Sequence, residues 1–108
     1  MFFNSQKGSS VAAEEAYKLA QVEGNILIDI REVDEYKSGA VPFAVNIPLS
    51  TFDMNIRDRL SKYKEVYVMC RSGGRSAQAV KFLKNIGVNA VDVSGGIIAW
   101  KNKNLPVV

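Results

Sequence analysis

Short runs of apolar residues alternate along this chain with longer amphipathic segments, and this alternation restricts the fold more than any other feature. Four runs read as strands: residues 25–30 (NILIDI), 43–48 (FAVNIP), 65–70 (EVYVMC) and 88–93 (VNAVDV). Short, mostly apolar runs of this kind are typical of strands buried on both faces of a parallel sheet. The alternation therefore predicts an α/β fold, a central parallel sheet of about four to five strands with helices on both faces.

The segments between and beside these runs predict helices or helical turns. They cover residues 9–24, 31–39, 50–64, 76–87 and 95–104. Ser9 or Ser10 is expected to cap the first helix, and Ser50 or Thr51 the third. Glycines at positions 24, 39 and 87 are expected to end three of the segments, because glycine readily adopts the left-handed conformation that follows a helix.

The composition limits both the size of the protein and the chemistry open to it. The 108 residues predict a single domain over 1–108, and 47% apolar residues is usual for a globular chain. There is one cysteine, Cys70, and no histidine. A zinc site needs several Cys or His ligands, so no metal is expected, and no other cofactor is expected either. A Cys–His or Ser–His catalytic pair is excluded, and any activation of Cys70 must come from other groups.

Charge is distributed unevenly along the chain. Residues 1–59 carry six basic and nine acidic side chains, whereas residues 60–108 carry eight basic and two acidic ones. The basic half contains Cys70 and favours an anionic small-molecule partner. Nucleic acid is not expected, because the basic residues are not interleaved with aromatic ones. A single cysteine, no apolar run near the ~20 residues of a membrane span and no signal-peptide pattern predict a cytoplasmic protein without a membrane partner.

Cys70 ends a predicted strand, and the stretch CRSGGRS follows it into a predicted helix that starts near Ser76. Ligands bind at the carboxyl ends of the strands in parallel sheets. A glycine-containing loop can turn its N–H groups inward around an anion, and the helix behind it adds the positive end of its dipole. Arg71 and Arg75 add two charges. These groups can lower the pKa of a thiol from its usual ~8.5 without a histidine.

Three motifs occur in order along the chain, and together they resemble the rhodanese family of sulfurtransferases. Residues 70–76 (CRSGGRS) are similar to the active-site loop of that family. Residues 27–48 (LIDIREVDEYKSGAVPFAVNIP) are similar to its upstream motif, and residues 93–100 (VSGGIIAW) to its C-terminal Gly-Gly-x-x-x-Trp signature. The three motifs span about residues 26–100. The resemblance implies a single rhodanese-like domain.

The chain departs from the pattern of the family at two positions in the upstream motif. Ala40 stands where the family usually has His, and Phe43 where it usually has Gly. We expect these changes to affect local packing or partner contacts and not the thiol chemistry. By the same resemblance, Asp29 and Arg31 give structural support at the end of a strand. Trp100 is expected to be a core residue that anchors the last helix.

The resemblance also implies a mechanism. Cys70 would attack the outer sulfur of thiosulfate or a persulfide, carry that sulfur as a persulfide, and pass it to cyanide, a thiol or a protein. Its donor-binding residues would be Arg71, Ser72, Gly73, Gly74 and Arg75, through the loop N–H groups and the two guanidinium groups. The expected partners are thus a small anionic sulfur donor and a thiophilic acceptor, and a monomer is expected.

Two other functions use a similar loop or domain. Cysteine-loop phosphatases and arsenate reductases have an arginine six positions after the cysteine, and here that position is Ser76. A non-catalytic rhodanese-like docking or regulatory module is the other alternative. Modules of that kind usually lack the cysteine that this chain retains.

Overall fold

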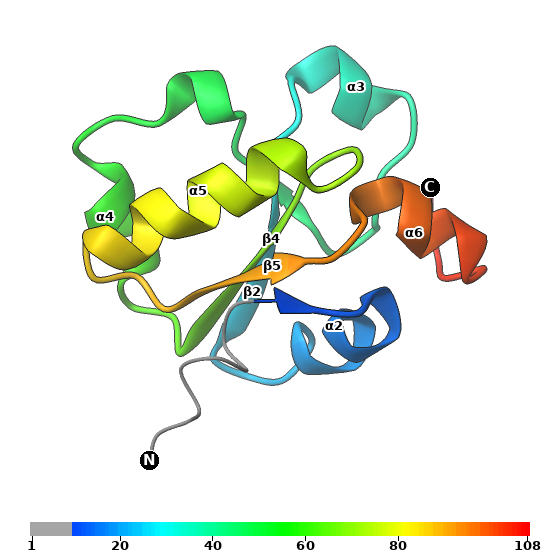
Figure 1. Cartoon of the computed structure of the whole chain (residues 1–108), viewed down its shortest axis with the longest axis horizontal. Coiled ribbons are helices and arrows are strands. Elements are labelled where there is room, and N and C mark those ends of the chain that lie inside the picture. Colours follow the sequence, from blue (N-terminus) through cyan, green and yellow to red (C-terminus); the bar gives the residue numbers. More distant parts are fainter. Residues whose placement is uncertain (1–9) are drawn as a thin grey trace.

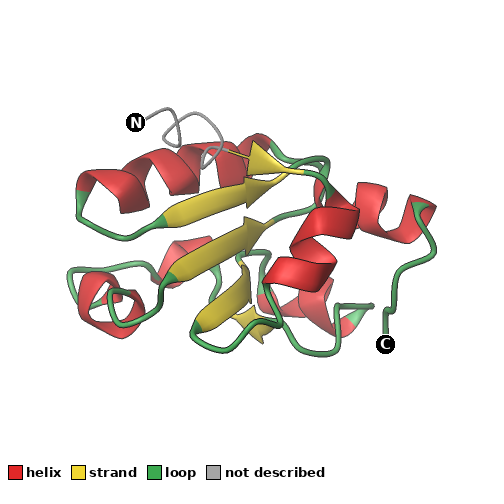
Figure 2. Cartoon of the chain, turned by 90° about the horizontal axis from the view of Figure 1, so that it is seen from below, coloured by secondary structure: helices red, strands yellow, loops and turns green. Residues whose placement is uncertain are grey.

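The computed structural model describes residues 10–108 and has an α/β fold built on one parallel sheet (Figures 1 and 2). The five strands are β1 (Ser10–Val11), β2 (Asn25–Asp29), β3 (Val45–Asn46), β4 (Glu65–Met69) and β5 (Ala90–Val93). They lie in the order β1-β5-β4-β2-β3. All paired strands are parallel. The predicted α/β fold with a parallel sheet is therefore confirmed.

Helices separate successive strands, as the alternation in the sequence predicts, and α6 follows the last strand. They are α2 (Ala13–Leu19), α3 (Val33–Lys37), the 3-10 helix η1 (Leu49–Thr51), α4 (Ile56–Leu60), α5 (Gly74–Asn85) and α6 (Gly96–Asn102). Helix α5 ends immediately before Ile86 and Gly87, whose φ of 92° is the left-handed conformation expected of a glycine after a helix. This boundary agrees with the sequence prediction.

The expected serine cap of the first helix is wrong for Ser10. That residue lies in β1, where it pairs with Asp92, and α2 begins at Ala13 after Ala12. Ser9, the other expected cap, lies outside the described residues. The helix also ends at Leu19 and not at Gly24. Turns follow it, in which the carbonyl of Leu19 accepts hydrogen bonds from the N–H of Val22 and from the side-chain amide of Asn25.

The expected cap at Ser50 or Thr51 is also wrong. Both residues belong to η1, and the Thr51 hydroxyl donates to the carbonyl of Pro48. Asp53 then accepts a hydrogen bond from the N–H of Asn55, which makes a local turn between η1 and α4. The predicted helix over residues 50–64 is thus two short helical pieces separated by a turn.

Alternate residues of each strand point to opposite faces of the sheet, and each face carries its own core. Helices α4 and α5 cover one face, with Ile56, Leu60, Val80 and Leu83 packed on β-strand residues and on Cys70. Helices α2 and α6 cover the other face. Trp100 is fully buried there, as expected, and its indole N–H donates to the carbonyl of Pro106.

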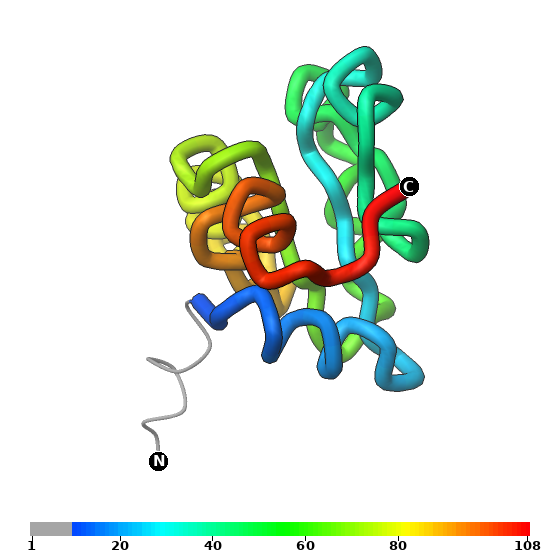
Figure 3. Tube along the Cα trace, turned by 90° about the vertical axis from the view of Figure 1, so that its right-hand side faces the viewer, coloured from blue at the N-terminus to red at the C-terminus, as the bar shows by residue number. Residues whose placement is uncertain are grey.

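The two residues that depart from the pattern of the rhodanese family take part in packing. Ala40 is buried and exchanges two backbone hydrogen bonds with Val108, so the C-terminal segment runs alongside it (Figure 3). Phe43 lies 6.2 Å, between ring centroids, from both Tyr17 and Trp100. Phe43 therefore packs on the α2 and α6 side of the sheet, and Ala40 pairs with the C-terminal segment. No helix within residues 10–108 is long and apolar enough to cross a membrane.

The starts of α5 and α6 meet at the carboxyl end of β4 (Figure 1). The N–H groups of Ile97 and Ile98 donate to the carbonyls of Cys70 and Arg71, at 2.9 and 3.1 Å. This approach requires Gly96, whose φ is 59°. A Cβ atom there would lie 2.4 Å from the Cys70 oxygen and 2.5 Å from the Arg71 oxygen. The first turn of α6 thus holds the backbone of the cysteine loop.

We expect Gly96→Ala to lower the free energy of unfolding by about 2–4 kcal/mol, because it adds backbone strain and overpacks the loop. Urea unfolding measures this loss. Gly74→Ala is the matched control, since a Cβ atom at Gly74 has no neighbour within 4 Å. A loss below about 0.5 kcal/mol for Gly96→Ala would contradict the proposed contact, because that is the range of neutral surface changes.

Candidate active site

The loop after β4 wraps its backbone around the sulfur of Cys70. The N–H of Gly73 donates to Cys70 Sγ at 3.0 Å, and the N–H of Ser76 donates to it at 3.3 Å. Gly73 caps α5 with a φ of 111°, a conformation that other residues rarely adopt. The loop therefore turns N–H groups inward, as predicted. Its conformation requires glycine at position 73, whereas a side chain at Gly74 would meet no atom within 4 Å.

Ser76 is the second group that the loop aims at the sulfur. It is fully buried, and its Oγ lies 3.3 Å from Cys70 Sγ. The same hydroxyl contacts the carboxylate of Asp92 on β5 and the carbonyl of Gly73. The position that carries an arginine in cysteine-loop phosphatases therefore holds a small hydroxyl directed at the sulfur.

The surroundings of Cys70 favour its thiolate. Burial by itself raises the pKa of the thiol, since it penalises the charged form. Hydrogen bonds from the Ser76 hydroxyl and from the N–H groups of Ser76, Gly73 and Ser72 act in the opposite direction and bring the pKa below its usual value. The site thus activates its thiol with backbone N–H groups and one hydroxyl, in a chain that has no histidine.

The two arginines of the loop have different surroundings. Arg75 makes a bidentate ion pair with Glu35 of α3, with N···O distances of 2.9 and 3.0 Å. This pairing with Arg75, helped by the N–H of Glu32, lowers the pKa of Glu35 to about 2. Arg71 is exposed and, among residues 10–108, forms no ion pair. The uncompensated positive charge of the loop therefore belongs to Arg71.

Asp29 and Arg31 form a buried ion pair at the end of β2. The shortest contact, from Arg31 Nη2 to Asp29 Oδ2, is 2.8 Å, and both side chains are at most 5% exposed. Arg31 also donates to the carbonyls of Glu35 and Gly39, at 3.2 and 2.8 Å. The pair therefore ties the end of β2 to the middle of α3 and to the glycine that follows this helix, and Glu35 of α3 in turn holds Arg75.

Three residues near Cys70 have contacts that the sequence did not reveal. Glu35 belongs to the upstream motif but had no assigned role, and its partner Arg75 is forty positions away. The sequence marks Ser76 as a helix start and as the residue at the phosphatase arginine position, and neither predicts its contact with the sulfur. Asp92 lies in a predicted strand, and the one available signal is that a carboxylate is unusual in an otherwise apolar run.

We expect Glu35→Gln to destabilise the protein by less than about 1 kcal/mol, because both side chains of the ion pair are about one-third exposed. The loss should depend on pH. The folded pKa of Glu35, about 2, lies below its unfolded value near 4.5. The pair therefore stabilises the fold above pH 4.5, and this contribution disappears as the pH falls toward 2.

Urea unfolding of wild type and Glu35→Gln across this pH range tests the expectation. The difference between the two proteins should be constant at neutral pH and should shrink in acid. A difference that stays the same from neutral pH down to the acid limit would contradict the ion pair.

Comparisons with known proteins agree with this geometry. A family model described as a rhodanese-like domain matches residues 12–103. A sulfurtransferase of Allochromatium vinosum is 37% identical over 92 residues, which cover 84% of this chain and 85% of that protein. The YtwF protein of Bacillus subtilis is 37% identical over 89 residues, which cover 82% of this chain and 85% of YtwF.

A solved structure gives the same result. The crystal structure of a rhodanese-related protein from Thermoplasma volcanium matches with a TM-score of 0.82 and 34% identity, over 93% of this chain and 97% of that chain. These matches confirm the resemblance drawn from the three motifs. The chain belongs to the rhodanese-like domain family.

Proposed function

We propose that this rhodanese-type sulfurtransferase carries the transferred sulfur as a persulfide on Cys70, taken from a small anionic donor such as thiosulfate. One observation supports the proposal above all others. The sulfur of the only cysteine in the chain accepts N–H groups from Gly73 and Ser76 at 3.0 and 3.3 Å, at the carboxyl end of a parallel strand. Such a sulfur is available as a nucleophile at neutral pH.

In the first step, the Cys70 thiolate attacks the outer sulfur of the donor. A new S–S bond forms, the S–S bond of thiosulfate breaks, and its electron pair leaves with sulfite. The loop N–H groups of residues 71–75 can stabilise negative charge on the sulfur atoms during the exchange. Arg71 can attract the donor, because its charge is not matched by a carboxylate, whereas Arg75 is already paired with Glu35.

In the second step, an acceptor attacks the outer sulfur and restores the Cys70 thiolate. Cyanide would leave as thiocyanate, and a thiol would leave as a persulfide. Cys70 is only 1% exposed, so the site favours a small donor. The sulfur that it gains projects about 2 Å further along a new S–S bond, which brings it closer to an incoming thiol. The acceptor class proposed here is therefore a thiol or a protein that presents one.

The intact mass of the reduced protein after treatment with thiosulfate tests the proposal. We expect a gain of one sulfur atom, because Cys70 is the single thiol, and we expect cyanide to remove it. Cys70→Ser is the matched control and should gain nothing. Sulfur uptake from persulfides but not from thiosulfate would mean that the donor is a persulfide. No uptake from either donor would contradict the proposal and favour a docking module.

A further inference from the structure

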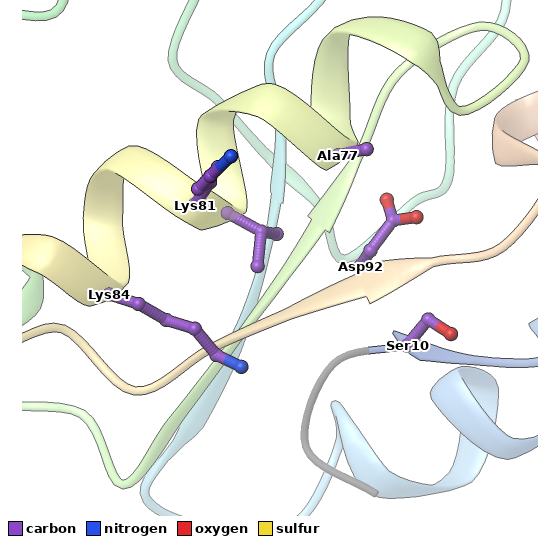
Figure 4. A pocket seen from close by; sticks show the side chains of 6 residues that line it. Ser10, Ala77, Lys81, Lys84 and Asp92 are labelled. Carbon is purple, nitrogen blue, oxygen red and sulfur yellow. The ribbon is translucent and has the colours of Figure 1, made fainter. Parts of the chain in front are cut away.

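Behind the cysteine loop, three polar side chains from three elements form a chain of contacts toward β5. Cys70 and Ser76 are at most 1% exposed, and Asp92 is half-buried. Cys70 Sγ contacts Ser76 Oγ at 3.3 Å, and Ser76 Oγ contacts Asp92 Oδ1. Asp92 points from β5 toward α5, on the side of Ala77 (Figure 4). Nothing in the sulfur-transfer steps described above uses this carboxylate.

The chain of contacts contains a conflict over one proton. A serine hydroxyl has a single proton to donate. That proton can stabilise the thiolate of Cys70 or the carboxylate of Asp92, but not both at once. When Cys70 is a thiol, it can donate to Ser76 Oγ, and the Ser76 hydroxyl can donate to Asp92 or to the carbonyl of Gly73. Ionisation of Cys70 requires the Ser76 proton to turn toward the sulfur, and the carboxylate then loses its donor.

Charged side chains lie on both sides of this chain of contacts, lysines toward α5 and an arginine toward the sulfur. On the side of α5, Lys81 and Lys84 line a cavity of about 370 Å³ together with Asp92. The neighbours of Asp92 within the sheet are uncharged, Ser10 on β1 and Val68 on β4.

Burial also acts on Asp92, and an ion pair holds the arginine near the sulfur. Burial raises the pKa of Asp92, and the hydrogen bond from the Ser76 hydroxyl acts in the opposite direction. Near the sulfur, the guanidinium of Arg75 is paired with Glu35 of α3.

We propose that Asp92 sets the protonation state of Cys70 through Ser76, because the two acidic groups compete for one hydroxyl proton. While Ser76 donates to an ionised Asp92, the Cys70 thiolate has only the backbone N–H groups as donors, so Cys70 keeps its proton to a higher pH. When Cys70 ionises, it releases its proton to solvent, the Ser76 proton turns to the sulfur, and the Asp92 carboxylate loses its donor. Asp92 is thus a positioning residue that acts through Ser76.

This competition has a consequence for the sulfur-loaded protein, and the consequence rests on the proposed function. The inner sulfur of a Cys70 persulfide carries no proton and no full charge. The Ser76 proton is then free to stay with Asp92. An ionised Asp92 therefore favours the thiol and the loaded states over the bare thiolate.

The rate of Cys70 alkylation by iodoacetamide as a function of pH tests the proposal, and it needs no sulfur donor. In Asp92→Asn, the amide can donate to Ser76 Oγ in the way that a protonated carboxyl does. We expect the midpoint of the alkylation profile to fall by about one pH unit, which is about tenfold more thiolate below the midpoint. Asp58→Asn, an exposed aspartate on α4, is the matched control and should leave the midpoint unchanged. A midpoint that stays or rises in Asp92→Asn would overturn the proposal.

A second pair of variants separates the shared proton from a simple charge effect. In a Ser76→Ala background, Asp92→Asn should shift the midpoint by less than a third of its effect in wild type. An undiminished shift would overturn the proposal, since the carboxylate would then act on the sulfur without Ser76. Should circular dichroism show that Asp92→Asn is unfolded, Asp92→Ala replaces it, with a lower midpoint again expected. Loss of persulfide formation would contradict only the proposed function, because the alkylation profile does not depend on it.

Discussion

The hydrogen bonds that Cys70 Sγ accepts from the loop N–H groups are the interaction on which the rest of the site depends. A buried sulfur anion is costly unless several donors point at it, and the chain has no histidine to assist. The donors stay in place because the loop is held from both sides. Helix α5 begins at Gly74 directly behind it, and the first turn of α6 bonds the carbonyls of Cys70 and Arg71.

A second layer of contacts holds the loop from the neighbouring strand. The buried Asp29–Arg31 pair secures the start of the segment that contains α3, and Glu35 of that helix then pairs with Arg75. This arrangement uses one loop arginine as a structural contact and leaves the other, Arg71, exposed to solvent. The positive charge available to an anionic donor is therefore smaller than the composition of the loop suggests.

Local patterns in the sequence predict the parallel sheet and the cysteine loop because each is encoded within a few residues. The apolar runs around β2 and β4 and the glycine that caps α5 are examples of such patterns. Strand β1 is different, because two residues are too short to show a period, and it forms only by pairing with β5. The pairing of Glu35 with Arg75 and the contact of Ser76 with Asp92 join positions forty and sixteen residues apart. Such contacts form only in the tertiary fold, so no local sequence pattern predicts them.

Backbone N–H groups and one hydroxyl lower the pKa of the Cys70 thiol below that of a free cysteine. Titration of the ultraviolet absorbance of the thiolate, with Cys70→Ser subtracted as the blank, measures this most directly. We expect a midpoint below the ~8.5 of a free thiol, because the hydrogen bonds to the sulfur outweigh its burial. A midpoint at or above that value would show that burial dominates and that the loop does not activate the thiol.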